Sequence, residues 1–433
     1  MNKISIFWFR RDLRLYDNTG LYYALQEDNP VLPLFIFDTE ILDDLKDKKD
    51  ARVTFIHNQI SKINDQLKEI GSGIVVKNGK PEDIFKDLIE NFDIQSVFTN
   101  RDYEPYALER DEKIDNILKH HGIGFYDFKD HVIFEKDEIL TGSNEPYKVF
   151  TPFKNKWLEK LETGHLHPFE IKLVKNKFHS FFPSVPTLND IGFERSSIEI
   201  PEKKYDRDII NNYDKDRDFP AKNGTSRLGI HLRFGTISIR EAVSIAKETN
   251  DTWLNELIWR DFYSMILANF PHVVSKAFKE KYDAVPWRNN KEDFQKWCDG
   301  KTGYPIVDAG MRELNETGYM HNRVRMITAS FLTKHLLIDW RWGEAYFAEK
   351  LLDYELASNN GGWQWAAGTG TDAQPYFRIF NPYSQTDKFD KQNNYIKKWI
   401  PELNTDQYPK PIVDHKEARQ RALDTYKSAL DNA

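Results

Sequence analysis

The sequence predicts an α/β domain followed by an all-helical domain, and two observations lead to this prediction. Up to about residue 130, short apolar runs alternate with amphipathic stretches; beyond about residue 200, helical periodicity dominates and strand-like runs disappear. The 433 residues, 40% of them hydrophobic, supply enough apolar side chains for two cores. We therefore expect a doubly wound parallel sheet in residues 1–130, a linker in 131–195 and a helical domain in 196–433.

Five apolar runs are the expected strands of the first domain. They are continuous rather than alternating, which is typical of strands covered on both faces in a parallel sheet. Helical patterns at 52–70 and 107–121 supply crossover connections between them. The runs are ISIFWF (4–9), VLPLFIF (31–37), GIVV (73–76), IQSVFT (94–99) and IGFYDF (123–128).

The stretch from 131 to 195 lacks this periodicity. It contains Pro, Ser, charged residues and scattered aromatic residues, including FFPSVPTLND at 181–190. We expect a long connector that runs over the surface.

Composition and termini indicate a cytoplasmic protein. The single cysteine, Cys298, excludes an intramolecular disulfide and fits a reducing compartment. The apolar run after Met1 is too short for a signal peptide, and no segment approaches the length of a membrane span. The net charge of −7 argues against generic nucleic-acid binding, although one basic face is compatible with an acidic remainder.

Several common motifs are absent from the sequence. GKT at 300–302 lacks the glycine of a phosphate-binding loop, because Gln295 occupies that position. The first expected strand is not followed by a glycine fingerprint for dinucleotides, and no G-x-S-x-G segment occurs. The twelve histidines show no metal-ligand spacing, so we expect no metal site.

Tryptophans are unevenly distributed, since only Trp8 and Trp157 precede residue 250 and nine others follow it. A large aromatic core explains most of them. In the expected helix 251–270, the second face bears a carboxylate, an indole and a guanidinium. That pattern suits either a salt-bridged, partly exposed face or a planar ligand that is stacked and hydrogen-bonded at its edge. The core face has Trp253, Leu254, Leu257, Ile258 and Ile266, and the second face has Glu256, Trp259, Arg260 and Tyr263.

An expected helix over 320–340 repeats this arrangement. One face has an amide, a cation and a thioether, which are either incidental or part of a site. The polar face consists of Asn322, Arg325, Met326 and Ala329, and the core face of Val324, Ile327, Phe331 and Leu332.

Two further segments have unusual polar density. Residues 351–382 combine acids, amides, two tryptophans and Gly-rich turns at a helix–loop junction, which is as compatible with a site as with a core. Gly-Thr-Ser-Arg-Leu (224–228) offers hydroxyls, backbone N–H groups and a cation. It suits either a cradle for an anion or pyrophosphate, or a helix start capped by Ser226.

Six long motifs together resemble the class I photolyases that repair cyclobutane pyrimidine dimers. The resemblance extends from residue 5 to beyond residue 400. It implies an α/β domain, a wrapping linker and a helical domain that holds FAD. The motifs are WFRRDLRLYDN, YKVFTPFKNKW, DFPAKNGTSRL, WLNELIWRDFY, KTGYPIVDAGMRELNETGYMHNRVRMITASFL and NNGGWQWAAGTGTDAQPYFRIFNP.

The resemblance assigns FAD contacts to five segments and places Asn359 beside flavin N5. Plant cryptochromes have Asp at that position, so Asn favours repair over signalling. The implied FAD contacts are Tyr213, Thr225, Ser226, Arg227, Leu228, Gly229, Trp253, Glu256, Arg260, Asn322, Arg325, Asp353, Tyr354, Glu355 and Asn359.

The resemblance also implies how damaged DNA is held. Trp259 and Trp365 would form two aromatic walls around the flipped dimer, while Glu256, Asn322 and Met326 would touch its bases. An electron path from the flavin to the surface would use Trp363, Trp340 and Trp297. Contacts with DNA, chiefly with its phosphates, would come from Arg217, Trp259, Arg323, Arg378, Gln385 and Lys388.

The implied activity is that of a monomeric deoxyribodipyrimidine photo-lyase acting on UV-damaged DNA. Reduced FAD would absorb blue light and pass an electron to the dimer, the ring would split and the electron would return. A cryptochrome-type photoreceptor and a photolyase for (6-4) photoproducts are the alternatives. Met326 stands where the second alternative needs a histidine, and no long C-terminal tail supports the first.

Three positions depart from the family pattern. Glu355 stands where Asp is expected, and Tyr319 replaces a common Trp. YEPYALERD (103–111) lacks the Asn-Glu pair of folate-binding members, which argues against a methenyltetrahydrofolate antenna. A deazaflavin, another flavin or no second chromophore stays open.

Overall fold

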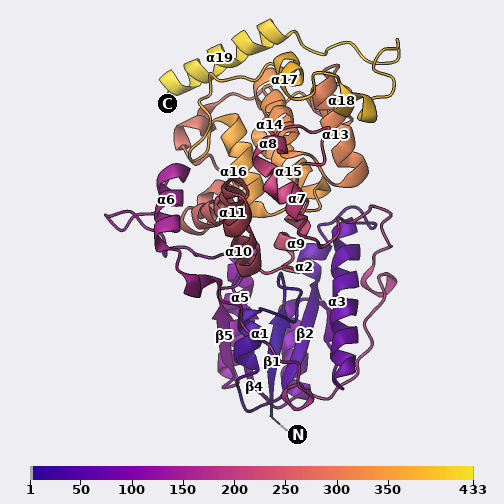
Figure 1. Ribbon diagram of the computed structural model, residues 1–433, viewed down its shortest axis with the longest axis vertical. Helices are drawn as coiled ribbons and strands as arrows, with labels where there is room; N and C mark the ends of the chain where they lie inside the picture. The colour runs from indigo at the N-terminus through magenta and orange to yellow at the C-terminus, as the bar shows by residue number, and fades with distance from the viewer. Residues whose placement is uncertain (1–2, 433) are drawn as a thin grey trace. The chain divides into compact units, whose positions relative to one another are not determined.

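Five parallel strands in the order β3-β2-β1-β4-β5 confirm the sheet that the sequence predicts (Figure 1). From β1 the chain builds outward to β2 and β3, then returns to the other side of β1 for β4 and β5, which is the doubly wound order. The strands are β1 (Ile4–Phe9), β2 (Val31–Asp38), β3 (Val75–Gly79), β4 (Ile94–Asn100) and β5 (Gly124–Phe128).

The helices between these strands begin at favourable residues. The Asp50 side chain accepts a hydrogen bond from the N–H of Arg52 and caps α3, while Pro81 and Pro105 occupy the first turns of α4 and α5. The apolar faces of α4 and α5 and the inner strands enclose a core in which Trp8 is almost completely buried. The helices are α1 (Thr19–Ala24), α2 (Thr39–Leu42), α3 (Ala51–Glu69), α4 (Pro81–Asn91) and α5 (Pro105–His120).

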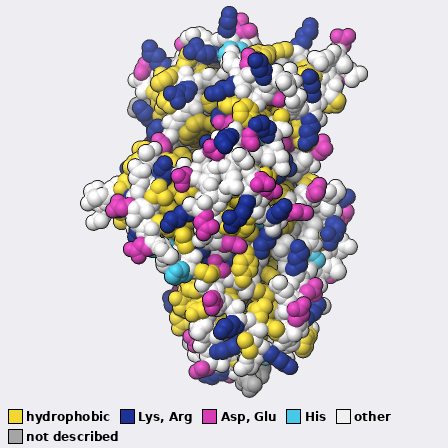
Figure 2. Space-filling model, viewed as in Figure 1, with side chains coloured by type: hydrophobic (Ala, Val, Ile, Leu, Met, Phe, Trp, Pro, Cys, Tyr) yellow, Lys and Arg dark blue, Asp and Glu magenta, His cyan; other side chains and the backbone are white. Residues whose placement is uncertain are grey.

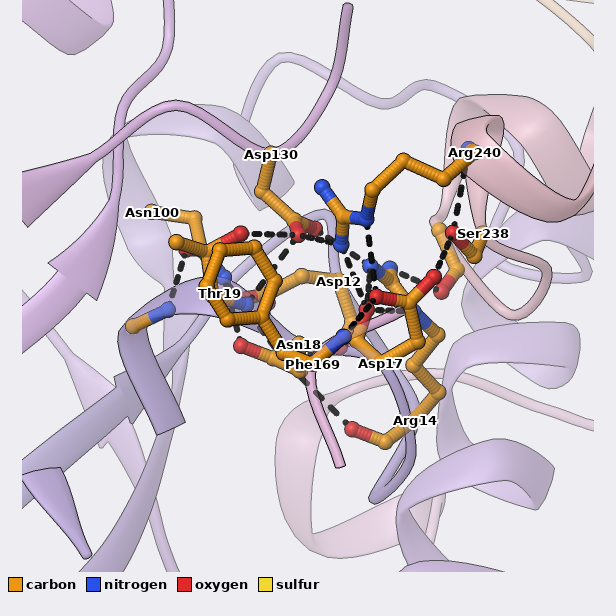
Figure 3. Close-up of polar contacts among 12 residues, drawn as sticks. Asp12, Arg14, Asp17, Asn18, Thr19, Asn100, Asp130, Phe169, Ser238 and Arg240 are labelled. Atoms are coloured by element: carbon orange, nitrogen blue, oxygen red, sulfur yellow. Dashed lines mark hydrogen bonds and ion pairs between the residues drawn. The ribbon is translucent and has the colours of Figure 1, made fainter. Parts of the chain in front are cut away.

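The segment that follows β1 contributes to a buried polar network, which is drawn in Figure 3. We call it the Asp130 network. Asp130 pairs with Arg14 at 2.6 Å and with Arg240 at 2.8 Å, and Arg240 also pairs with Asp17 at 2.7 Å. Burial by itself would raise the pKa of Asp130, but the two guanidinium groups outweigh it and hold that pKa well below its usual range. The network comprises Asp12, Arg14, Asp17, Asn18, Thr19, Asn100, Asp130, Ser238 and Arg240.

The computed structural model describes residues 3–432, which divide into two units with separate cores. The first contains the sheet, and the second contains most of the helices. The predicted linker is shared between them, and the predicted domain bounds stay predictions. The first unit comprises Met1–Glu135, Leu161–Lys203 and Leu228–Ile245, and the second comprises Lys136–Lys160, Lys204–Arg227 and Ala246–Ala433.

Helices build the second unit, which confirms the all-helical prediction for this part of the chain (Figure 1). The first unit also includes α9 (Gly229–Arg233) and the start of α10 (Ile239–Thr249). The helices of the second unit are α6 (Phe150–Lys160), α7 (Arg207–Asn211), α8 (Tyr213–Asp216), α11 (Asp251–Asn269), α12 (Lys291–Cys298), α13 (Pro305–Thr317), α14 (Asn322–Ser330), α15 (Trp340–Lys350), α16 (Leu356–Ala367), α17 (Pro382–Phe389), α18 (Asn394–Trp399) and α19 (His415–Asp431).

Two helical segments differ from the sequence expectation. The connector expected over 131–195 contains α6, whose Phe150, Phe153 and Trp157 side chains are buried. The single helix expected over 320–340 is also wrong: α14 ends at Ser330 and a π-helical turn follows. Leu337 then has a φ of 49°, which interrupts the helical path before α15 begins.

Among the helices of residues 3–432, none combines the length and apolar character that crossing a membrane requires.

Candidate functional site

Helix α11 presents the two faces that its sequence predicts. Its expected core side chains are buried, with Trp253 and Leu254 each 4% exposed and Ile258 fully buried. Glu256, Trp259 and the rest of the second face are half-buried. Asn250 begins the helix by accepting hydrogen bonds from the N–H groups of Thr252 and Trp253, which sets the register of both faces.

Helix α16 lies at the centre of the site, because α11, α14 and α15 all pack against it. The approach of α11 is close. A Cβ atom added at Gly361 would come within 2.2 Å of the Tyr263 ring, so only glycine permits this contact. The packing brings together the side chains that the sequence places on three separate segments.

Two arginines of the site are held by carboxylates just before or at the start of α16. Arg260 of α11 pairs with Glu355 at 3.0 Å. Arg325 of α14 donates to both oxygens of Asp353 at 3.0 and 3.1 Å. Burial alone would lower the pKa of Arg325, but the Asp353 carboxylate outweighs it and raises that pKa, so the guanidinium stays charged. Glu355, at the position where Asp is expected, thus pairs with Arg260.

Asn359 is held by a residue that the sequence analysis missed. Its amide nitrogen donates to the Glu344 side chain at 2.8 Å and to the Glu344 carbonyl at 3.1 Å. Both amide hydrogens are therefore used, and Oδ1 is the acceptor left for a ligand. Burial raises the pKa of Glu344, and the Asn359 bond opposes that change. The segment WRWGEAY showed no local signal, because the contact joins α15 to α16.

Glu256 forms an ion pair with Arg217. Burial raises the pKa of Glu256, and the Arg217 charge partly opposes that rise. Both side chains keep 34% of their surface accessible. The ion pair is therefore partly accessible to solvent.

Two family models match separate segments of this chain, and together they identify its family. The model described as DNA photolyase matches residues 5–172, and that described as FAD binding domain of DNA photolyase matches residues 253–406. The chain belongs to the DNA photolyase family. The deoxyribodipyrimidine photo-lyase of Escherichia coli is 39% identical over 466 residues, covering 98% of both chains. That of Vibrio cholerae is 38% identical over 479 residues, covering 98% of this chain and all of the relative.

Solved photolyase structures share the whole architecture. A bacterial class III photolyase from Agrobacterium tumefaciens has a TM-score of 0.89 at 33% identity and covers 100% of this chain and 98% of its own. An archaeal photolyase from Sulfolobus tokodaii with two FAD molecules has a TM-score of 0.84 at 36% identity, covering 98% and 99%. A Synechocystis cryptochrome has a TM-score of 0.84 at 23% identity, which shows a common fold alone.

The residues around α16 suit the FAD of this photolyase family. Desolvation is the largest influence on the pKa of Glu256 and of Arg325, yet 34% and 25% of these side chains stay accessible. Both side chains therefore keep accessible surface beside α16. The charged Arg325, the free oxygen of Asn359 and the Arg260 guanidinium are donors and acceptors for a flat polar ring.

The first three residues of the expected phosphate cradle at 225–229 belong to the second unit. Thr225 and the Tyr319 hydroxyl lie 3.0 Å apart, and the Arg227 guanidinium lies 4.6 Å from the Tyr319 ring centroid. Arg227 has a φ of 53°, a conformation that turns the backbone sharply. Ser226 does not cap α9, whose N-cap is Leu228, so the capped-helix alternative is wrong in that detail.

Other predicted site residues differ in accessibility. Asn322 is exposed at the start of α14, Met326 and Trp365 are half-buried, and Trp253 is buried. Tyr213 at the start of α8 and Tyr354 before α16 are half-buried, while Leu228 and Gly229 belong to the first unit.

The predicted DNA contacts include both paired and exposed side chains. Arg323 pairs with Asp218 at 2.7 Å, whereas Arg378 and Lys388 are exposed. The Gln385 side-chain oxygen is buried without a hydrogen-bond partner among the described residues. On the face shown in Figure 2, Lys and Arg side chains are interspersed with Asp and Glu. The basic side chains visible on that face are therefore distributed rather than gathered into one uniform patch.

The predicted tryptophan path does not reach the surface. Trp363, Trp340 and Trp297 are only 3%, 1% and 0% exposed, so the expectation of an exposed end is wrong. Trp297 meets Trp363 edge-on, with ring centroids 6.0 Å apart. Contacts continue through Phe294 at 5.9 Å and 5.2 Å to the half-buried Trp342. The role of the three tryptophans in electron transfer stays a prediction.

The edge of the sheet where an antenna would bind is lined by paired side chains. Tyr106 donates to Asp38 at 2.6 Å, and the Arg110 guanidinium lies 4.9 Å from the Trp8 ring centroid. Glu104 pairs with Arg11 and Arg233, each at 2.9 Å. Glu104 of YEPYALERD is therefore already engaged, and the expectation of no folate at this edge stays a prediction.

Proposed function

We propose that this chain is a light-driven deoxyribodipyrimidine photo-lyase that uses FAD to split cyclobutane pyrimidine dimers in DNA. The observation that carries the proposal is that α11 and α14 both pack against α16. Glu256 and Trp259 lie on α11, Arg325 on α14, and Asn359 and Trp365 on α16 itself. The family, and relatives of this activity that match along almost the whole chain, support it.

The helical domain would bind FAD through charged and amide side chains. Arg325, held by Asp353, would meet an anionic edge of the flavin, and the Asn359 oxygen would accept a hydrogen bond from it. The bound, reduced FAD supplies, after absorbing blue light, the electron that opens the cyclobutane ring. Glu344 keeps the Asn359 amide in the orientation that offers its oxygen.

The dimer would leave the duplex and enter a pocket with aromatic walls. Damage weakens stacking and pairing, so a dimer costs less to flip than an intact step; photolyases are themselves an example of this general rule. Trp259 and Trp365 would contact its apolar faces, and Glu256 would hydrogen-bond its polar edge. Arg378 and Lys388, which are exposed, would hold phosphates without reading sequence.

Two aspects of the proposal concern the cell. Cys298 is buried, and burial raises the pKa of its thiol to about 12, so it is inert rather than redox-active. This agrees with action in the cytoplasm. We expect the enzyme to act as a monomer.

The test is repair by the purified flavin-bound protein. DNA with a defined cyclobutane dimer, single- or double-stranded, is mixed with reduced enzyme and illuminated with blue light, and the remaining dimers are counted. We expect loss of dimers in light only. Intact dimers under light, with flavin bound and reduced, would contradict the proposal. A parallel substrate with a (6-4) photoproduct should stay unrepaired.

A further inference from the structure

Phe150 stacks on Trp259, the predicted wall of the dimer pocket. The two ring centroids are 3.7 Å apart, and the planes differ by 6°. Phe150 is 7% exposed, and its ring also meets the edge of the fully buried Phe262 at 5.8 Å. Phe150 therefore covers one face of an indole that is itself only half-buried.

The helix that begins with Phe150 is fastened across α11. The Trp157 indole of α6 donates to Asp261 of α11 at 2.9 Å in the interior. Phe153, one turn after Phe150, packs against Phe262 at 5.2 Å. Because two other contacts hold α6 in place, the Phe150 ring is a fixed support for Trp259 and not a mobile cover.

The segment around Phe150 also binds the chain that follows α16. The Phe150 N–H donates to Asp372 at 3.1 Å, and the Thr371 hydroxyl donates to the Lys148 carbonyl at 2.7 Å. Residues 371–372 come shortly after Trp365, the second predicted wall. One short segment thus contacts the helix of the first wall and the extension of the helix that bears the second.

We propose that Phe150 is a positioning residue of the dimer pocket, which fixes the plane of Trp259 and, through Asp372, its separation from Trp365. This inference rests on the proposed function, since it assumes that the two indoles enclose a flipped pyrimidine dimer. Stacked aromatic walls bind through area and shape, so a tilted or displaced indole loses affinity for the lesion. The flavin contacts lie on other side chains and would be unaffected.

The test compares Phe150→Leu with Phe153→Leu in the flavin-bound enzyme. Both remove a buried ring from α6, but only the first removes the support of Trp259. We expect Phe150→Leu to raise KM for dimer-containing DNA by about two- to tenfold, the factor that corresponds to one aromatic pair. The repair rate at saturating DNA and fixed light, and the absorption spectrum of the flavin, should not change. Phe150→Tyr, which keeps the ring, should restore KM.

A second variant keeps the test decisive if Phe150→Leu fails to fold. Asp372→Gly removes the acceptor of the Phe150 N–H, and glycine accepts the φ of 43° at this position without strain. Asp372→Gly should also raise KM for dimer-containing DNA. The inference is overturned if Phe150→Leu leaves KM unchanged, lowers it, or changes it no more than Phe153→Leu does. A wild-type protein that repairs no dimers contradicts the proposed function instead.

Discussion

The Asp130 network of the first unit and the site around α16 in the second unit are both built from arginine–carboxylate pairs, but they differ in accessibility. Asp130 and Arg14 are 2% and 4% exposed, and their partners are other buried side chains. Arg325 and Asp353 also form a close pair, at 3.0 Å, yet about a quarter of each side chain is accessible. A closed network holds the fold together, whereas a pair with free surface can also meet a ligand.

The contributions of Asp130 and Glu256 to stability should change with pH in opposite directions. The lowered pKa of Asp130 means that its contribution to stability is present above the unfolded pKa and is lost as the pH falls through the folded pKa. The raised pKa of Glu256 means that its ionised form costs stability, and the cost is relieved as the pH falls. Four predictions, ordered from the largest expected effect to the smallest, test the comparison between the Asp130 network and the site around α16.

Asp130→Asn should destabilise the first unit most. It leaves two buried guanidinium groups without their shared carboxylate, at a cost of about 3–5 kcal/mol. Urea unfolding followed by circular dichroism measures the change. The control, Glu109→Gln, breaks an exposed pair with Lys113 at 2.8 Å and should leave unfolding nearly unchanged. If both substitutions lowered the free energy of unfolding equally, the distinction between buried and exposed ion pairs would be contradicted.

Arg325→Met should weaken FAD binding more than it weakens the fold. Loss of a charge-assisted contact costs about 1.5–3 kcal/mol, or about ten- to hundredfold in affinity. Flavin retained per protein after dialysis, measured by absorbance, reports the loss. Arg323→Met, two residues away in α14, should keep the flavin and reduce DNA affinity. A variant at 325 that retains its flavin would exclude Arg325 from the cofactor site.

Glu344→Gln should affect the state of the bound flavin through Asn359. An amide in place of the carboxylate can also donate, so the Asn359 amide loses its preferred orientation, at a cost of about 1 kcal/mol. We expect the flavin spectrum during illumination with a reductant to change, while FAD is still bound. Glu349→Gln on the same helix is the control and should behave as the wild type.

Arg217→Gln should move the titration of Glu256 to higher pH. The neighbouring cation stabilises the carboxylate, so its removal raises the pKa of Glu256 further. Dimer affinity measured across pH should show its inflection at higher pH than in the wild type. An inflection that stays in place would mean that the ion pair does not control this carboxyl group.

The sequence was sufficient for features that depend on neighbours along the chain. The apolar runs located all five strands, and the spacing of Trp253, Leu254, Leu257 and Ile258 identified the buried face of α11. It failed where packing overrides periodicity, as in the helix expected over 320–340. It also placed the surface end of the tryptophan path at Trp297, which is fully buried. Exposure depends on which other residues cover a side chain, and the periodicity of the sequence does not report that.

By itself the sequence determined the α/β-then-helical order, the family and the residue types of the site, since these follow from local patterning and long motifs. Only the tertiary structure decided which side chains hold one another. Glu344 reaches Asn359 from the preceding helix, Phe150 reaches Trp259 from a helix distant in the chain, and Asp130 is enclosed by Arg14 and Arg240. Such contacts arise from the packing of several elements at once, so no local pattern in the sequence specifies them.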